Sequence, residues 1–137
     1  DLADIEWAWL QAYHAADAAP MLLADLAGLD EDGLLDLPVS LHPASRLVPV
    51  QSRIGALLPE LAGSSSPDAR HLLITRPEAE VLLHPLGALQ ADLAARIGNF
   101  ACMRNLLSAA IETADEAEAL PAIFALIEAG MLARPGG

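Results

Sequence analysis

Residues 70–84 read RHLLITRPEAEVLLH and decide the fold. Two short segments with apolar centres, residues 70–76 and 79–84, flank the dipeptide Pro77-Glu78. Apolar segments of this length that are bounded by turn residues are typical of β-strands. We therefore predict a β-hairpin whose strands are joined by a tight turn at Pro77-Glu78.

The sequence after the hairpin changes to a helical pattern. Leucine and isoleucine recur at intervals of three or four residues over 86–97, which is the spacing of one helix face. Asn99 and Asp115 are candidate N-caps for two further helices, and Gly130 is a candidate helix stop. We predict three successive helices after the hairpin.

The sequence before the hairpin predicts a further strand and an N-terminal helix. Residues 39–50 favour one or two short strands, in which Pro43 and Pro49 force bulges or an edge position. Residues 2–16 predict a helix that ends before Pro20. The expected fold is α+β and winged-helix-like, a small antiparallel sheet with a hairpin followed by three helices. Residues 1–37 would form a helical arm, and residues 38–137 the winged-helix-like domain.

The composition disfavours several classes of protein. The 137 residues carry a formal net charge of −12 and no Lys, which excludes a P-loop lysine and Schiff-base chemistry. Residues 1–45 hold nine acids and no Arg, so most of the surface would repel a nucleic acid. We see no apolar run long enough to span a bilayer and no signal peptide, and expect a cytoplasmic protein. Because the chain begins with Asp, we expect it to be a fragment or a processed piece.

The residues that carry chemistry are scattered. His14, His42, His71 and His84 stand alone in separate segments, without the spacing of a metal site. Cys102 is the single cysteine, which excludes an internal disulfide, and a buried thiol is expected there. We therefore expect no enzymatic activity, no metal and no cofactor.

The first helix carries most of the aromatic side chains and is the first candidate binding surface. Trp7, Trp9, Tyr13 and His14 form a candidate partner interface, since Trp and Tyr are typical interface anchors. Packing beneath the sheet is the alternative. Trp7 and Trp9 lie about 200° apart around a helix, so one is expected to pack inward and the other to meet a partner.

The second strand of the hairpin is the other candidate surface. If it lies at the sheet edge, its free N–H and C=O groups can pair with an extended peptide. The third helix would form the wall beside it, or its apolar side chains would lie wholly in the core. The candidate peptide-binding residues are Glu80, Val81, Leu82, Leu83, His84, Phe124 and Ile127.

Three motifs carry a resemblance to a known family. The opening helix LADIEWAWLQAYHAADAAP, the triplet Leu41-His42-Pro43 with Arg46-Leu47 after it, and the pair Arg76-Pro77 resemble the C-terminal half of the HvfC/BufC proteins, whose family label is DNA-binding. That resemblance implies a domain similar to the PqqD-like peptide recognition element of ribosomal peptide pathways. It also implies a partner, a multinuclear non-haem iron oxidase that holds the metal and modifies cysteines of a precursor peptide. In this chain aliphatic residues stand where the family has aromatic and basic ones.

Three hypotheses follow. The first is a non-catalytic adaptor that binds a precursor (leader) peptide by strand addition and presents it to a partner iron oxidase. The second is a DNA-binding transcriptional regulator of winged-helix type, although residues 100–114 offer only Arg104 as a cation. The third is a purely structural or dimerising domain.

Overall fold

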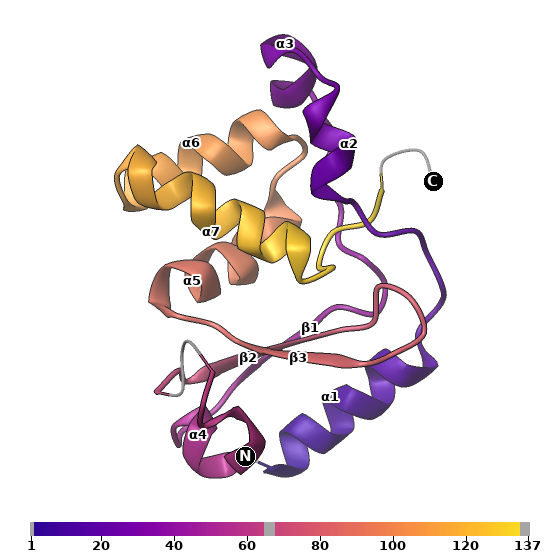
Figure 1. Cartoon of the computed structure of the whole chain (residues 1–137), viewed down its shortest axis with the longest axis vertical. Helices are drawn as coiled ribbons and strands as arrows, with labels where there is room; N and C mark the ends of the chain where they lie inside the picture. The colour runs from indigo at the N-terminus through magenta and orange to yellow at the C-terminus, as the bar shows by residue number, and fades with distance from the viewer. Residues whose placement is uncertain (1, 65–67, 135–137) are drawn as a thin grey trace.

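A computed structural model describes residues 2–64 and 68–134 of the chain. It has an α+β fold in which helices lie on both faces of a three-stranded antiparallel sheet (Figure 1). The elements run in the order α1 (Leu2–His14), α2 (Leu23–Ala27), α3 (Glu31–Leu35), β1 (Arg46–Pro49), α4 (Ile54–Leu57), the 3-10 turn η1 (Pro59–Leu61), β2 (His71–Thr75), β3 (Leu82–Pro85), α5 (Ala88–Arg96), the 3-10 turn η2 (Ile97–Asn99), α6 (Met103–Thr113) and α7 (Glu116–Glu128).

The sheet has the order β1-β2-β3, so β1 and β3 are its two edges. The Val50 amide donates to the Arg70 carbonyl, and the Leu86 amide donates to the His71 carbonyl. Along an antiparallel strand, the backbone groups of successive residues point alternately toward the neighbouring strand and away from it. Pro49 and Pro85 therefore stand where the backbone nitrogen faces away from β2 and no ladder donor is lost. The expectation that prolines mark an edge strand is confirmed for β1.

Alternation along β2 builds two separate hydrophobic cores. Leu73 belongs to the larger core, which includes side chains of α5, α6 and α7. Leu72 and Ile74 point to the opposite face and pack in a second core with side chains of α1 and α4. Figure 1 shows α1 and α4 on one side of the sheet and α5, α6 and α7 on the other.

α1 lies on the sheet through small side chains. Ile5, Ala8 and Ala12 are its buried residues, and the helix packs against β1 and β2. Two alanines four residues apart let the helix axis approach the strands closely. The prediction that one tryptophan packs inward is wrong, because both Trp7 and Trp9 are exposed beside this small-residue face.

The hairpin loop is longer than the sequence indicated. β2 ends at Thr75 and β3 begins at Leu82, so the predicted tight turn at Pro77-Glu78 is a loop over 76–81. Its shape depends on Arg76, whose side chain turns toward the end of α1 and donates to the carbonyl of Glu78. Since this guanidinium bonds residues 64 positions away along the chain, no local pattern could reveal it.

Helix ends follow the sequence only in part. Asp115 is the N-cap of α7, and Gly130 follows that helix with φ +85, a conformation that favours glycine. An added Cβ at Gly130 would meet the ring of Pro77 at 2.7 Å, so the loop and the end of α7 touch here. Asn99 does not cap the second helix, because the chain continues as η2 and Cys102 is the N-cap of α6, where its side chain is half-buried.

The predicted arm is attached to the rest of the molecule at several points. The Met21 amide donates to the Leu132 carbonyl, and the Arg134 amide donates to the Ala19 carbonyl. α2 packs against α7, and α3 packs against α6. Within residues 2–64 and 68–134, no helix has the length and apolar character needed to cross a membrane.

Candidate functional site

The strand predicted to bind a peptide lies at the edge of the sheet. Leu82 and His84 face Thr75 and Leu73 of β2, and no strand of the described residues pairs with the other side of β3. The Leu86 amide donates to the His71 carbonyl, so residues 82, 84 and 86 direct their backbone groups toward β2. The backbone N–H and C=O groups of Leu83 consequently point away from the sheet.

Each edge strand offers an added strand one outward backbone amide. On β1 it belongs to Leu47, because Pro49 has no N–H and the Ser45 amide donates to the His42 carbonyl. On β3 it belongs to Leu83, because Pro85 has no N–H. The two edges therefore offer equal numbers of donors, and β3 is the edge on which the predicted peptide-binding residues lie.

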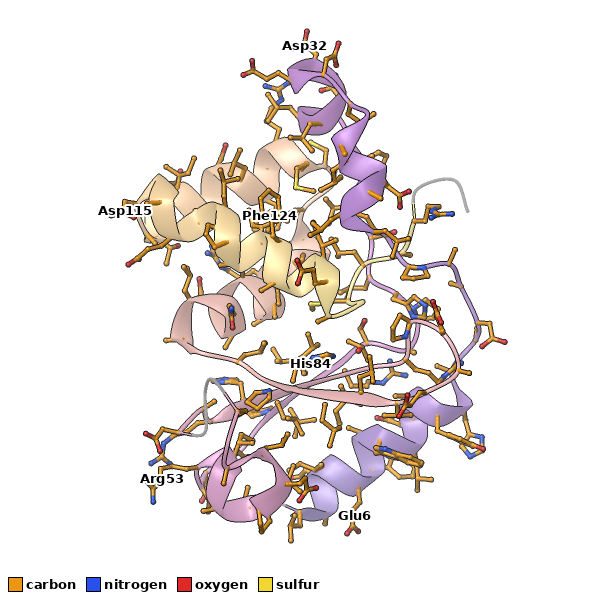
Figure 2. All side chains as sticks on the ribbon, in the orientation of Figure 1. Glu6, Asp32, Arg53, His84, Asp115 and Phe124 are labelled. Carbon is orange, nitrogen blue, oxygen red and sulfur yellow. The ribbon has the colours of Figure 1, made fainter. Side chains whose placement is uncertain are left out.

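The side chains of this segment alternate between the two layers of helices. Val81 and Leu83 are half-buried against the core beneath α1. His84 rises on the opposite face, between β3 and the layer of α5 and α7 (Figure 2). Glu80 lies exposed in the loop before β3, and Leu82 is half-buried on the His84 side of the strand.

His84 is tied into the sheet through Thr75. The Thr75 hydroxyl donates to the Ala129 carbonyl at 2.6 Å and lies 2.9 Å from Nε2 of His84. A hydroxyl has one proton, so His84 Nε2–H donates to Thr75 Oγ1. Burial lowers the pKa of His84, and the Ala129 carbonyl partly offsets that effect. This histidine is a neutral structural group near pH 7.

The two groove residues predicted on α7 separate in the structure. Phe124 is 38% exposed on the outer face of the helix, where Figure 2 labels it. Ile127 is only 1% exposed and belongs to the large core. The prediction that Ile127 lines a peptide groove needs correction, because the helix face carrying it packs inward.

The predicted partner interface on α1 is exposed. Trp9 and Tyr13 stack with ring centroids 5.3 Å apart and planes 8° from parallel, and His14 meets the Tyr13 ring edge-on at 5.1 Å. Tyr13 borders a shallow depression of about 710 Å³ that Pro77, Glu78 and Ala79 also line. Trp7 is the most exposed of the aromatic residues of α1. It lies about 200° around the helix from Trp9, so its ring is on another face than the stacked pair.

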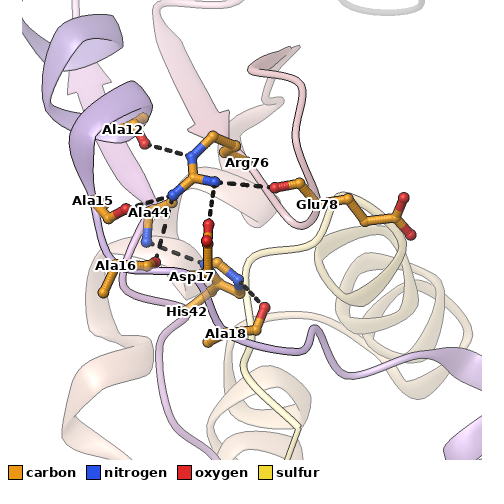
Figure 3. A network of polar contacts seen from close by, with 9 residues as sticks. All are labelled: Ala12, Ala15, Ala16, Asp17, Ala18, His42, Ala44, Arg76 and Glu78. Atoms are coloured by element: carbon orange, nitrogen blue, oxygen red, sulfur yellow. Dashed lines mark hydrogen bonds and ion pairs between the residues drawn. The ribbon is translucent and has the colours of Figure 1, made fainter.

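Arg76 connects this helix to the hairpin loop (Figure 3). Its Nε donates to the Ala12 carbonyl at 2.8 Å and its Nη2 to the Ala15 carbonyl at 2.5 Å. Its Nη1 pairs with Asp17 at 2.7 Å and donates to the Glu78 carbonyl at 3.0 Å. The last carbonyls of a helix lack partners within the helix and carry partial negative charge, so a buried guanidinium satisfies them.

His42 holds the segment that follows α1. Its Nε2 lies 2.8 Å from the Ala18 carbonyl, and its Nδ1 accepts the Ala44 amide at 3.1 Å. Sequence reasoning named Arg76 only among the motifs of the resemblance and gave it no structural role. His42 precedes Pro43, a position that suggests a side chain capping the local backbone, and its bond from the Ala44 amide is such a cap.

The remaining polar residues include the side-chain types that ligate metal ions. Across the residues that the structure describes, no three His, Cys, Asp or Glu side chains gather as they would around a metal ion. Arg104, the cation of the predicted DNA-reading helix, pairs with Asp36 at 3.3 Å. Comparison with family models, with curated proteins and with solved structures finds no match to this chain.

Proposed function

We propose that this chain is a non-catalytic adaptor that binds an extended segment of a precursor peptide along the outer edge of β3. The bound segment would form a fourth strand and be presented to a partner enzyme. The observation that carries the proposal is the open edge of β3, where the backbone groups of Leu83 point away from β2.

The order of elements supports a peptide-recognition domain of winged-helix type. An antiparallel three-stranded sheet is followed by α5, α6 and α7. α7 belongs to the helix layer on the sheet face of His84, and Phe124 is its exposed aromatic side chain. A strand added to β3 would direct every second side chain toward this layer.

The choice of partner comes from the resemblance to the HvfC/BufC proteins. Two of its motif residues, His42 and Arg76, are buried and support α1 and the loop that leads into β3. On this proposal the partner is a multinuclear non-haem iron oxidase, which supplies the metal and the chemistry. Both proteins would act in the cytoplasm, where a ribosomal peptide is made.

A paired substitution tests the strand-addition step. A displayed library of random twelve-residue peptides is selected on the full chain, and the enriched peptides are titrated calorimetrically against Leu83→Pro and Leu47→Pro. Both leucines are half-buried, and each carries an outward amide on its own edge of the sheet. Proline removes that amide without deleting a bond to β2.

We expect Leu83→Pro to abolish binding and Leu47→Pro to retain it. Circular dichroism and urea unfolding of both variants establish that each is folded. Enriched peptides that bind folded Leu83→Pro as tightly as the unsubstituted chain would exclude strand addition at β3. The absence of any enriched peptide would also contradict the proposal.

A further inference from the structure

We infer that the stacked pair Trp9–Tyr13 on α1 is a second wall of the peptide groove, selecting a segment with apolar side chains at alternate positions and Arg or Lys between them. This inference rests on the proposed function and adds to it the chemistry of the ligand. The two walls would be α7 on one face of the added strand and α1 on the other.

The faces of α1 differ in what they contact. Ile5, Ala8 and Ala12 lie on the sheet, and Trp9 and Tyr13 follow them around the helix on one flank. That flank faces the hairpin loop, because Tyr13 borders the same depression as Pro77, Glu78 and Ala79. The loop continues directly into β3, so the Tyr13 end of this flank lies beside the segment that leads into the open edge.

The side chains of β3 point to the same place. Val81 and Leu83 lie on the sheet face that α1 covers, where they are half-buried. A peptide strand beside β3 would place every second side chain on this face, next to the flank of α1. Apolar or aromatic side chains at those positions would cover Trp9 and Tyr13, which are 38% and 54% exposed.

The wall is held in place before any ligand binds. Arg76 bonds the end of α1 to the loop before β3, with contacts to Ala12, Ala15 and Glu78. The stack of Trp9 on Tyr13 limits the rotamers of both rings. Side chains that are already ordered lose little entropy on binding, which favours affinity.

The charge around the groove identifies the occupant as basic. Glu78 and Glu80 are exposed in the loop that leads into β3, and the whole chain carries a net charge of −12. Arg76, the cation of this loop, is buried and bonded to α1. A second copy of the chain would bring another net charge of −12 to the same edge, so a basic peptide fits better.

The test uses defined probes and a matched pair of tryptophans. The probes are two eight-residue peptides with blocked ends, one alternating Arg with Leu and the other alternating Glu with Leu. Trp9→Ala removes the proposed wall, and Trp7→Ala removes an equally large side chain from elsewhere on α1. In the variant Trp7→Phe, Trp9 is the single tryptophan, and its fluorescence reports directly on this flank.

We expect the Arg-Leu peptide to bind the full chain and the Glu-Leu peptide not to bind. Trp9→Ala should weaken binding about tenfold or more, as for an interface anchor, and Trp7→Ala less than about twofold. Binding should also shift the emission of Trp7→Phe to shorter wavelength. Equal affinities of Trp9→Ala and Trp7→Ala, or equal binding of the two peptides, would overturn the inference.

Leu83→Pro separates this inference from the proposed function. If Leu83→Pro does not bind the Arg-Leu peptide and Trp9→Ala still binds it, strand addition at β3 is supported and the second wall is rejected. If neither variant loses the peptide, both are rejected. The free chain could also form a dimer, and Leu83→Pro could abolish that dimer. This result would show that a second copy of the chain occupies the edge, and it would reject the basic peptide as occupant.

Discussion

Arg76 is the residue on which the position of α1 depends. Its side chain is 7% exposed, and its guanidinium bonds three backbone carbonyls of α1 and the segment after it, as well as the Asp17 carboxylate. A charge this deeply buried is stable only because every donor has a partner. The same contacts place α1 beside the hairpin loop.

Replacing Arg76 with Ala should therefore lower the free energy of unfolding by about 2–4 kcal/mol, since buried carbonyls lose their donor. Urea unfolding followed by circular dichroism measures the change. Arg53→Ala is the control, because Arg53 pairs with Asp68 on the surface, at side-chain exposures of 61% and 79%. That substitution should cost less than about 1 kcal/mol. Equal effects of the two substitutions would contradict the role assigned to Arg76.

His84 should make stability depend on pH. Burial lowers its pKa in the folded chain below the ordinary value of 6.5, so the unfolded chain takes up the proton first as pH falls. Its contribution to stability is present above pH 6.5 and is lost as the pH falls through the lowered pKa of the folded state. Asp25 also has a lowered pKa, through the Leu22 amide, but it starts from 3.8 and acts at more acidic pH.

The measurement compares urea unfolding at about pH 7.5 and pH 5.5 in the unsubstituted chain and in His84→Gln. The substituted chain should lose less stability between the two pH values, because glutamine does not titrate. Identical losses in both chains would show that His84 does not cause the dependence.

α1 is the element whose packing the sequence described least well. Leu2, Ile5, Trp9 and Tyr13 stand three or four residues apart, a spacing that predicts one apolar helix face, yet of these four only Ile5 is buried. Alanines at 8 and 12 form the rest of the contact, because close approach to a flat sheet favours small side chains over large ones. The aromatic rings are left on the flank.

Enlarging the buried face should test this close approach. Ala12 is fully buried, and Ala12→Leu should destabilise the chain by about 1–3 kcal/mol through overpacking. Ala3→Leu is the control on the exposed side of α1 and should change stability by less than about 0.5 kcal/mol. Thermal unfolding of both variants gives the comparison. A neutral Ala12→Leu would mean that α1 lies farther from β1 and β2 than the structure places it.

For the hairpin, the sequence predicted the strands well and the loop poorly. The ends of its two strands were predicted within three residues, because short apolar segments bounded by charged and turn residues are local signals. Its loop was not, since Arg76 and Pro77 take their positions from α1 and from Gly130. Of the candidate groove residues, those on β3 could be identified from the strand pattern, while the burial of Ile127 depends on how α7 packs.

At the scale of the whole molecule, the net charge of −12 should govern association with a basic peptide. Opposite charges steer encounter over distances of about 10 Å, and added salt screens this attraction. We expect the affinity for the Arg-Leu peptide to fall several-fold, by about five- to tenfold, between 50 and 500 mM NaCl. Stopped-flow fluorescence of Trp7→Phe should assign most of the change to the association rate. An affinity independent of salt would exclude a role for the acidic surface.

The sequence by itself determined the α+β class, the strands of the hairpin, the three helices after it and the acidic character of the surface. These properties depend on composition and on residues a few positions apart, where periodicity, capping and turn propensity act. Only the tertiary structure decided that β3 is an edge, which flank of α1 is left open, that Ile127 is buried and that Arg76 joins helix to loop. Each of these features depends on packing between segments far apart along the chain, and the spacing of neighbouring residues does not specify which segments come into contact.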